Sequence, residues 1–284
     1  MSYPIIRQHE EIISKDTRHR ISIRYHKVTS AINREFYGIE SDSQHCLYVG
    51  SYGRGTAIDA SDIDILVELP LEKYSLYNDV DGNGQSRLLQ AVRSAIKKIY
   101  TKSAVQADGQ VVKIAFSDGM LFEILPAFRN QNGLGRLFDI WDGTYKYPNT
   151  NNGGRWLVTN PKAEQTAMRK KNVNSNGLLF DTCKHFRRVK QYLCVDTLPG
   201  DVIDSFVYGA IGSWKWQHSR DVADATHGEY ALVLLNHFNS SFRKSLLAKM
   251  WSGISLSAPG SERQVDINDD VINCLERVVR YITE

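Results

Sequence analysis

The sequence predicts an α+β protein of two lobes, an N-terminal mixed sheet with helices at residues 1–160 and a helical lobe at residues 161–284. Three observations predict this division. Short apolar runs that we expect to be strands lie in the first half of the chain, at residues 46–67, 111–116 and 120–125. In the second half, apolar residues recur at three- and four-residue steps, which is the spacing of amphipathic helices. Between the halves, residues 129–160 are rich in Gly, Asn, Tyr and Trp and indicate an ordered connection.

The N-terminal lobe begins with a long helix, because apolar residues from Ile21 to Phe36 keep a helical spacing that ends near Gly38. The Ser-Asp-Gly sequence at residues 117–119 is typical of a tight turn between two strands. The elements expected after the first helix are, in order, a strand–turn–strand unit at 46–67, a polar loop at 77–85, a helix at 86–100 and a hairpin of strands at 111–116 and 120–125.

The C-terminal lobe begins at Asn160-Pro161, since Asn is a favourable N-cap and Pro suits the first helical position. Two apolar stripes, at residues 179–193 and 271–282, predict long helices. Residues 252–264, which lie between them, are expected to form a loop.

Composition limits the functional classes. With 42% apolar and 24% charged residues, the 284-residue chain resembles an ordinary globular enzyme. Its formal net charge of +3 is too small to predict genomic nucleic acid as a partner. The sequence has neither a membrane-spanning apolar stretch nor a signal-peptide core, and its four cysteines lack metal-binding spacing. We therefore expect a cytoplasmic protein without a membrane partner.

Residues 46–67, which read CLYVGSYGRGTAIDASDIDILV, carry the strongest chemical signal. Asp62 and Asp64 are two residues apart on an expected strand, so both side chains project from one face, with Cβ atoms roughly 6.6 Å apart. Two such carboxylates can share the paired metal ions of a phosphoryl-transfer site. Gly50-Ser51 precedes them at the end of the first strand, where backbone N–H groups can bind a phosphate. This order predicts a nucleotidyltransferase.

A third carboxylate is expected because two-metal sites usually need more than two acidic ligands. Glu123 is the only charged residue in the apolar run 120–126, and burying an unpaired carboxylate there would be unfavourable. Asp118 is a rival candidate, although its Ser-Asp-Gly context is that of a turn. Asp62, Asp64 and Glu123 are thus the expected catalytic and metal-binding residues. An all-oxygen site of this kind suits two Mg²⁺ ions, with Mn²⁺ as an alternative.

These motifs resemble the polymerase-beta-like nucleotidyltransferase superfamily, whose signature is Gly-Ser, a short spacer, Asp-x-Asp and a later acidic strand. The chain is more specifically similar to bacterial cyclic-oligonucleotide synthases, which are related to cyclic GMP-AMP synthase and oligoadenylate synthetase. The resemblance covers roughly residues 20–215 and implies a bilobed fold whose helical lobe completes the nucleotide cleft. Four segments carry it: GSYGRGT at 50–56 with SDID at 61–64, FEILPAF at 122–128, NGGRW with TNP at 152–161, and FRRVK at 186–190.

The resemblance also implies nucleotide-binding residues in the second lobe. Lys190 would contact the triphosphate, and Ser205 would touch a phosphate. The family's serine–aromatic pair implies that Phe206 stacks on a base, although core packing is the role that we favour for this ring. The chain departs from the family pattern by having Glu at position 123, one methylene longer than Asp. It also lacks the Cys/His cluster of the animal DNA sensor, so direct DNA binding is not expected.

The resemblance therefore implies an Mg²⁺-dependent enzyme that condenses nucleoside triphosphates into a cyclic di- or trinucleotide and releases pyrophosphate. ATP, GTP or both are the expected substrates, and a pyrimidine nucleotide stays open. The product would act as a second messenger on a separate effector in bacterial anti-phage defence. One alternative is transfer of a nucleotide to a tRNA end, a protein or a small molecule. Another is a nucleotide sensor without catalysis, against which the three carboxylates argue.

Overall fold

The computed structural model describes residues 5–10, 12–59, 62–130, 143–217, 229–243, 256–261, 263–265 and 267–283. The chain divides into two units. The sheet unit comprises Ser14–Gly53 and Ala60–Lys162, and the helical unit comprises Met1–Ile13, Arg54–Asp59 and Ala163–Glu284. Two short segments far from Ala163–Glu284 in the sequence group with the helical unit, where Ile6 packs in the apolar core and Arg54 joins a buried ion network.

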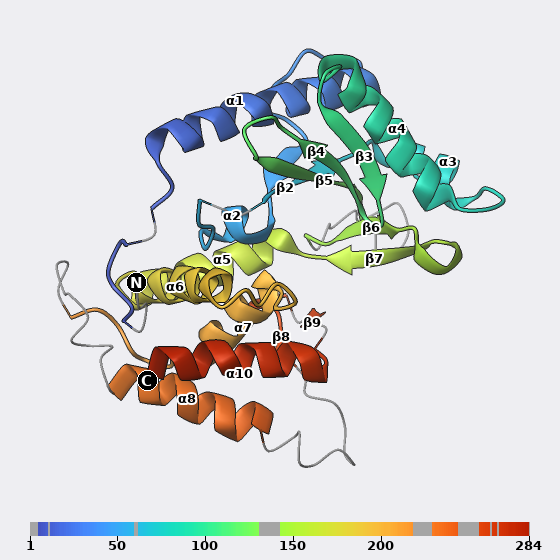
Figure 1. Cartoon of the computed structure of the whole chain (residues 1–284). Coiled ribbons are helices and arrows are strands. Elements are labelled where there is room, and N and C mark those ends of the chain that lie inside the picture. Colours follow the sequence, from blue (N-terminus) through green and yellow to red (C-terminus); the bar gives the residue numbers. More distant parts are fainter. Residues whose placement is uncertain are drawn as a thin grey trace. The chain divides into compact units, whose positions relative to one another are not determined.

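In its described residues, the sheet unit has seven strands: β1 (Cys46–Tyr48), β2 (Ile63–Glu68), β3 (Ala104–Asp108), β4 (Val111–Ala115), β5 (Leu121–Arg129), β6 (Tyr145–Asn149) and β7 (Arg155–Thr159). Five of them lie in the order β1-β2-β5-β4-β3, and β6 joins β5 to β7. Strands β2 and β5 run parallel, whereas the other pairs are antiparallel. The sheet is therefore mixed, as the sequence predicted (Figure 1).

One face of this sheet is covered by α1 (Lys15–Ile32) and α4 (Gly84–Ile99), as Figure 1 shows. Alternate residues of β2 and β5, among them Ile63, Ile65 and Ile124, are buried in the same apolar cluster as Ile32 and Val92 of these helices. Because side chains alternate along a strand, the intervening residues of β2 and β5 lie on the opposite face. Shorter helices are α2 (Gly50–Arg54), α3 (Ser75–Asn78) and the 3₁₀ turns Leu71–Lys73 and Asn151–Gly153.

Several predicted elements are confirmed and others were missed. The first helix continues through a π-helical turn, Asn33–Tyr37, to a left-handed Gly38, and the predicted hairpin is β4–β5. The connection expected at residues 129–160 contains β6, in which Pro148 and Asn149 are not typical of a strand, and β7. Residues 131–142 lie outside the described part. Strand β3 was also missed, because Ala104–Asp108 contains one strongly apolar residue.

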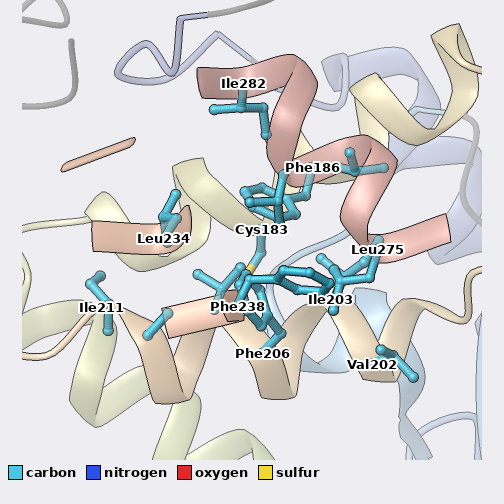
Figure 2. Close-up of a cluster of buried hydrophobic side chains, with 14 of the residues drawn as sticks. Cys183, Phe186, Val202, Ile203, Phe206, Ile211, Leu234, Phe238, Leu275 and Ile282 are labelled. Carbon is cyan, nitrogen blue, oxygen red and sulfur yellow. The ribbon is translucent and has the colours of Figure 1, made fainter. Parts of the chain in front are cut away.

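The helical unit contains α5 (Pro161–Asn174), α6 (Leu178–Tyr192), α7 (Gly200–Ala210), α8 (Glu229–Phe238), a π-helical turn (Asn239–Arg243) and α10 (Asp269–Thr283), with β8 (Leu256–Ser257) paired to β9 (Gln264–Val265). Both predicted apolar stripes are buried, and Figure 2 shows Phe186, Phe206 and Leu275 among the packed side chains. The loop expected at residues 252–264 is described only in part and includes β8 and the first residue of β9. Across the described ranges, no helix is both long and apolar enough to span a bilayer.

A buried ion network holds the helical unit together around Asp204 of α7. Its carboxylate accepts hydrogen bonds from Arg187 at 2.6 and 3.0 Å, from Arg54 at 2.8 Å and from the hydroxyl of Thr56 at 2.9 Å. Burial alone would raise the pKa of Asp204, but the two arginines outweigh it and hold that pKa at about 2. The segment that contains Arg54 and Thr56 is thereby fixed to α6 and α7 within this unit.

Candidate active site

The pairing of β2 with β5 brings two of the predicted carboxylates side by side. Asp64 and Glu123 are partners in the parallel register. Registered neighbours project from the same face of a sheet on strands about 4.8 Å apart. Asp62, two residues before Asp64, continues the same alternation, since Ile63 and Ile65 are buried on the opposite face. The three carboxylates predicted from separate parts of the sequence therefore share one face of the sheet.

The electrostatics of Glu123 reflect this arrangement. Asp62 is exposed, whereas Asp64 and Glu123 are half-buried. Burial raises the pKa of Glu123, and the negative charge of Asp62 raises it further, while Lys113 acts in the opposite direction. Asp62 and Glu123 are thus close enough to repel each other. A positive charge placed among them would relieve this repulsion.

Lys113 of β4 supplies part of that positive charge and was missed by the sequence analysis. It lies directly across the antiparallel pair from Glu123, and its Nζ is 3.5 Å from Glu123 Oε1 and 2.8 Å from Asp108 Oδ2. The signal was present in the predicted hairpin: a turn at residues 117–119 pairs position 113 with position 123. Side chains in such a cross-strand pair are within reach of each other.

The turn between β1 and α2 lies against Asp64. Gly50 has a φ of +56°, and a Cβ atom at this position would stand 1.8 Å from Asp64 Oδ2. The position therefore requires glycine for two reasons, its left-handed backbone and the close approach of the carboxylate. The amide of Val49 donates to the carbonyl oxygen of Asp64 at 2.9 Å, which fixes the turn to β2. Gly50 and Ser51 thus begin α2 beside a predicted metal ligand; Ser61 of the same motif lies outside the described residues.

The chemistry of these side chains suits a hard divalent cation. Three carboxylates that lie near one another, with the charge of Asp62 adding to burial in raising the pKa of Glu123, supply the oxygen donors that Mg²⁺ prefers. In their present rotamers, no group of three His, Cys, Asp or Glu side chains within the described ranges is arranged to hold a metal ion.

The rival carboxylate, Asp118, has a structural role. Its two oxygens accept hydrogen bonds from Arg24 at 3.0 Å each, and Arg20 lies 3.5 Å away. These arginines lower the pKa of Asp118 through the hydrogen bonds from Arg24 and through their charges. The ion pair attaches the β4–β5 turn to α1 and explains an acidic residue here without a metal.

The nucleotide-binding residues predicted in the helical unit have different environments. The Phe206 ring is 0% exposed and packs against Phe186 and Phe238 in the core (Figure 2), which supports core packing rather than stacking on a base. Ser205 is only 3% exposed, and its Oγ has no hydrogen-bond partner among the described residues, so burial does not support a phosphate contact. Lys190 is half-buried on α6.

A mixed sheet that carries Asp62, Asp64 and Glu123 on one face, beside a Gly-Ser turn, has the architecture of a nucleotidyltransferase. A family model described as the Second Messenger Oligonucleotide or Dinucleotide Synthetase domain matches residues 9–172, more than half of the chain. The chain therefore belongs to this family and is a nucleotidyltransferase of the cyclic-oligonucleotide synthase class.

Solved structures of such synthases share the fold. The chain is 14% identical to the STING-associated CdnE c-di-GMP synthase from Capnocytophaga granulosa, with a TM-score of 0.67 over 95% of this chain and 80% of that one. It is 13% identical to the CdnE cyclic dinucleotide synthase from Elizabethkingia meningoseptica, solved with GTP and Apcpp, with a TM-score of 0.64 over 99% and 97% of the two chains. It is 12% identical to the CD-NTase CdnG from Bradyrhizobium diazoefficiens, solved with GTP, with a TM-score of 0.59 over 99% of this chain and 85% of that one. No curated protein matches the sequence.

Proposed function

We propose that this protein condenses nucleoside triphosphates into a cyclic di- or trinucleotide and releases pyrophosphate, in a reaction that depends on Mg²⁺. The register of Asp64 with Glu123 is the observation that carries the proposal, because it brings together two carboxylates from segments almost sixty residues apart in the chain. The family to which the chain belongs makes second-messenger nucleotides, and three similar structures contain GTP, Apcpp or Upnpp.

Each residue has a role in this proposal. Asp62, Asp64 and Glu123 would hold two Mg²⁺ ions, which supply charge stabilisation for the attacking and leaving oxygens of an in-line displacement. Gly50 and Ser51 would bind a phosphate at the start of α2, next to Asp64. Asp64 would keep its orientation because Gly50 leaves room for its carboxylate. Lys190 is proposed as a further phosphate contact in the helical unit.

Analysis of the reaction product tests the proposal. Purified protein with the four ribonucleoside triphosphates and Mg²⁺ should yield a phosphatase-resistant product whose mass is that of a cyclic nucleotide. Replacing Asp62 and Asp64 together by Asn should lower turnover by at least about 100-fold, since it removes the charges that stabilise the transition state. Asp81→Asn makes the same chemical change at an exposed position of the sheet unit and should leave turnover unchanged. A product that is only a linear adduct on an added acceptor would contradict the cyclase assignment.

We further propose that the product acts on a separate effector in bacterial anti-phage defence. Two of the similar structures are described as STING-associated c-di-GMP synthases, which supports a signalling role for a product of this kind. Bacteria that carry the intact gene neighbourhood should resist phage, and the Asp62→Asn/Asp64→Asn change should abolish that resistance. Equal resistance with and without the carboxylates would contradict this role.

A further inference from the structure

The helical unit contains a cavity that the proposed reaction does not use. Its volume is about 520 Å³, and it lies where the C-terminal parts of α5 and α7 meet the residues that follow α7. Three lysines line it, Lys170, Lys171 and Lys215, and none of its lining residues is acidic. The remaining polar and aromatic lining includes Asn174, Tyr208 and Trp214. The cavity is thus strongly cationic within a protein of small net charge.

Lys171 is the least hydrated of the three lysines. Its ammonium donates to the carbonyl oxygen of Tyr208 and lies 4.2 Å from the centre of the Tyr208 ring. Burial lowers the pKa of Lys171, and its charge adds to the effect of burial in lowering the pKa of His237. Among the described residues, no carboxylate pairs with Lys170, Lys171 or Lys215. A partly dehydrated ammonium without an anionic partner favours binding of an anion.

The lining also indicates which anion fits. Lysines bind phosphate as flexible point charges, and aromatic side chains can offer a face to a planar base. Tyr208 and Trp214 lie beside the lysines, and a cavity of this size is within the range of small-molecule sites. We propose that this pocket, formed entirely within the helical unit, binds a nucleoside monophosphate moiety, with the lysines on the phosphate and the aromatic residues beside the base. It is a ligand site in addition to the carboxylates of the sheet unit.

Calorimetric titration with AMP, in the presence of EDTA, tests this proposal without relying on metal-dependent catalysis. AMP should bind the wild-type protein, while adenosine and inorganic phosphate should each bind at least about tenfold more weakly, since each lacks half of the contacts. Lys170→Met/Lys215→Met should weaken AMP binding at least about tenfold. Both lysines are exposed, so the variant should fold normally, which thermal melting checks. Arg169→Met removes a positive charge from an exposed position on α5 outside the cavity, and it should leave AMP affinity within about twofold.

Three results would overturn the proposal. One is the absence of AMP binding to the wild-type protein, and another is AMP binding that survives Lys170→Met/Lys215→Met. Inorganic phosphate binding as tightly as AMP would leave a simple anion site and refute the nucleoside part. Asp62→Asn/Asp64→Asn should retain AMP binding in EDTA even when turnover is lost. Failure of the pocket and failure of the proposed reaction are therefore separable.

Discussion

Lys113 allows the electrostatic argument for the carboxylates to be tested directly. Because its ammonium pairs with Glu123, it competes with any cation that the carboxylates bind. Lys113→Met removes this competitor and should raise the affinity for Mg²⁺. The change removes one positive charge from beside Glu123.

The magnitude follows from the pair's geometry. Two unit charges 3.5 Å apart interact by about 5 kcal/mol at an effective dielectric constant of about 20. Lys113 is 35% exposed and Glu123 is 25% exposed, and Lys113 also shares its charge with Asp108, so most of this energy is screened. Exposed pairs contribute about 0.5–1 kcal/mol, which corresponds to a roughly two- to fivefold increase in Mg²⁺ affinity.

Two measurements check this prediction. The first is the Mg²⁺ concentration that gives half-maximal pyrophosphate release. The second does not depend on turnover: electron paramagnetic resonance of free and bound Mn²⁺ in the presence of a non-hydrolysable triphosphate. Lys97→Met, which removes an exposed lysine of α4, serves as the matched control. Unchanged or weaker metal binding in Lys113→Met would refute the account of Glu123 as a metal ligand that Lys113 neutralises.

Three further predictions concern other parts of the chain. Asp204→Asn should destabilise the helical unit by about 3–5 kcal/mol in denaturant unfolding, because it leaves two buried arginines without their carboxylate. The folded-state pKa of Asp204 is depressed to about 2, so its ionisation contributes about 2–3 kcal/mol to the free energy of unfolding. This contribution is complete above the ordinary pKa of 3.8 and is lost as pH falls through about 2. A wild-type acid-unfolding profile identical to that of Asp204→Asn would contradict this. Gly50→Ala should lower turnover by about 100-fold, since its Cβ would displace the Asp64 carboxylate, and wild-type pyrophosphate release would count against the close approach. Phe206→Leu should lower stability by about 1 kcal/mol without changing the KM for nucleotide, whereas a raised KM at unchanged stability would restore a stacking role.

Local patterns predicted much of the fold, and the reasons for the failures are physical. The α1 helix was predictable because Ile21, Val28 and Ile32 keep a helical spacing, and the β4–β5 hairpin because a Ser-Asp-Gly turn separates two apolar runs. Strand β3 was not, since its place at the end of the sheet order depends on pairing with β4 and requires little apolar character. Strands β6 and β7 are likewise held by pairing with each other and with β5.

The candidate site shows the same limits. The two-residue spacing of Asp62 and Asp64 places both side chains on the same face of a strand by geometry alone. Glu123 could be identified because it is the only charged residue in an apolar run. The sequence could not predict that β2 and β5 lie side by side or that Asp64 pairs with Glu123, because the register of parallel strands depends on tertiary packing. The sequence left two roles open for Phe206, because a family-like serine–aromatic pair looks the same whether the ring is exposed or buried.

Anomalous scattering from Mn²⁺ in crystals of the protein with a non-hydrolysable nucleoside triphosphate tests the central claim most directly. We expect metal ions coordinated by Asp62, Asp64 and Glu123, with the triphosphate completing their coordination and Lys113 paired with Asp108 alone. Metal bound without Glu123, while Glu123 stays paired with Lys113, would contradict the assignment of these three carboxylates as one site.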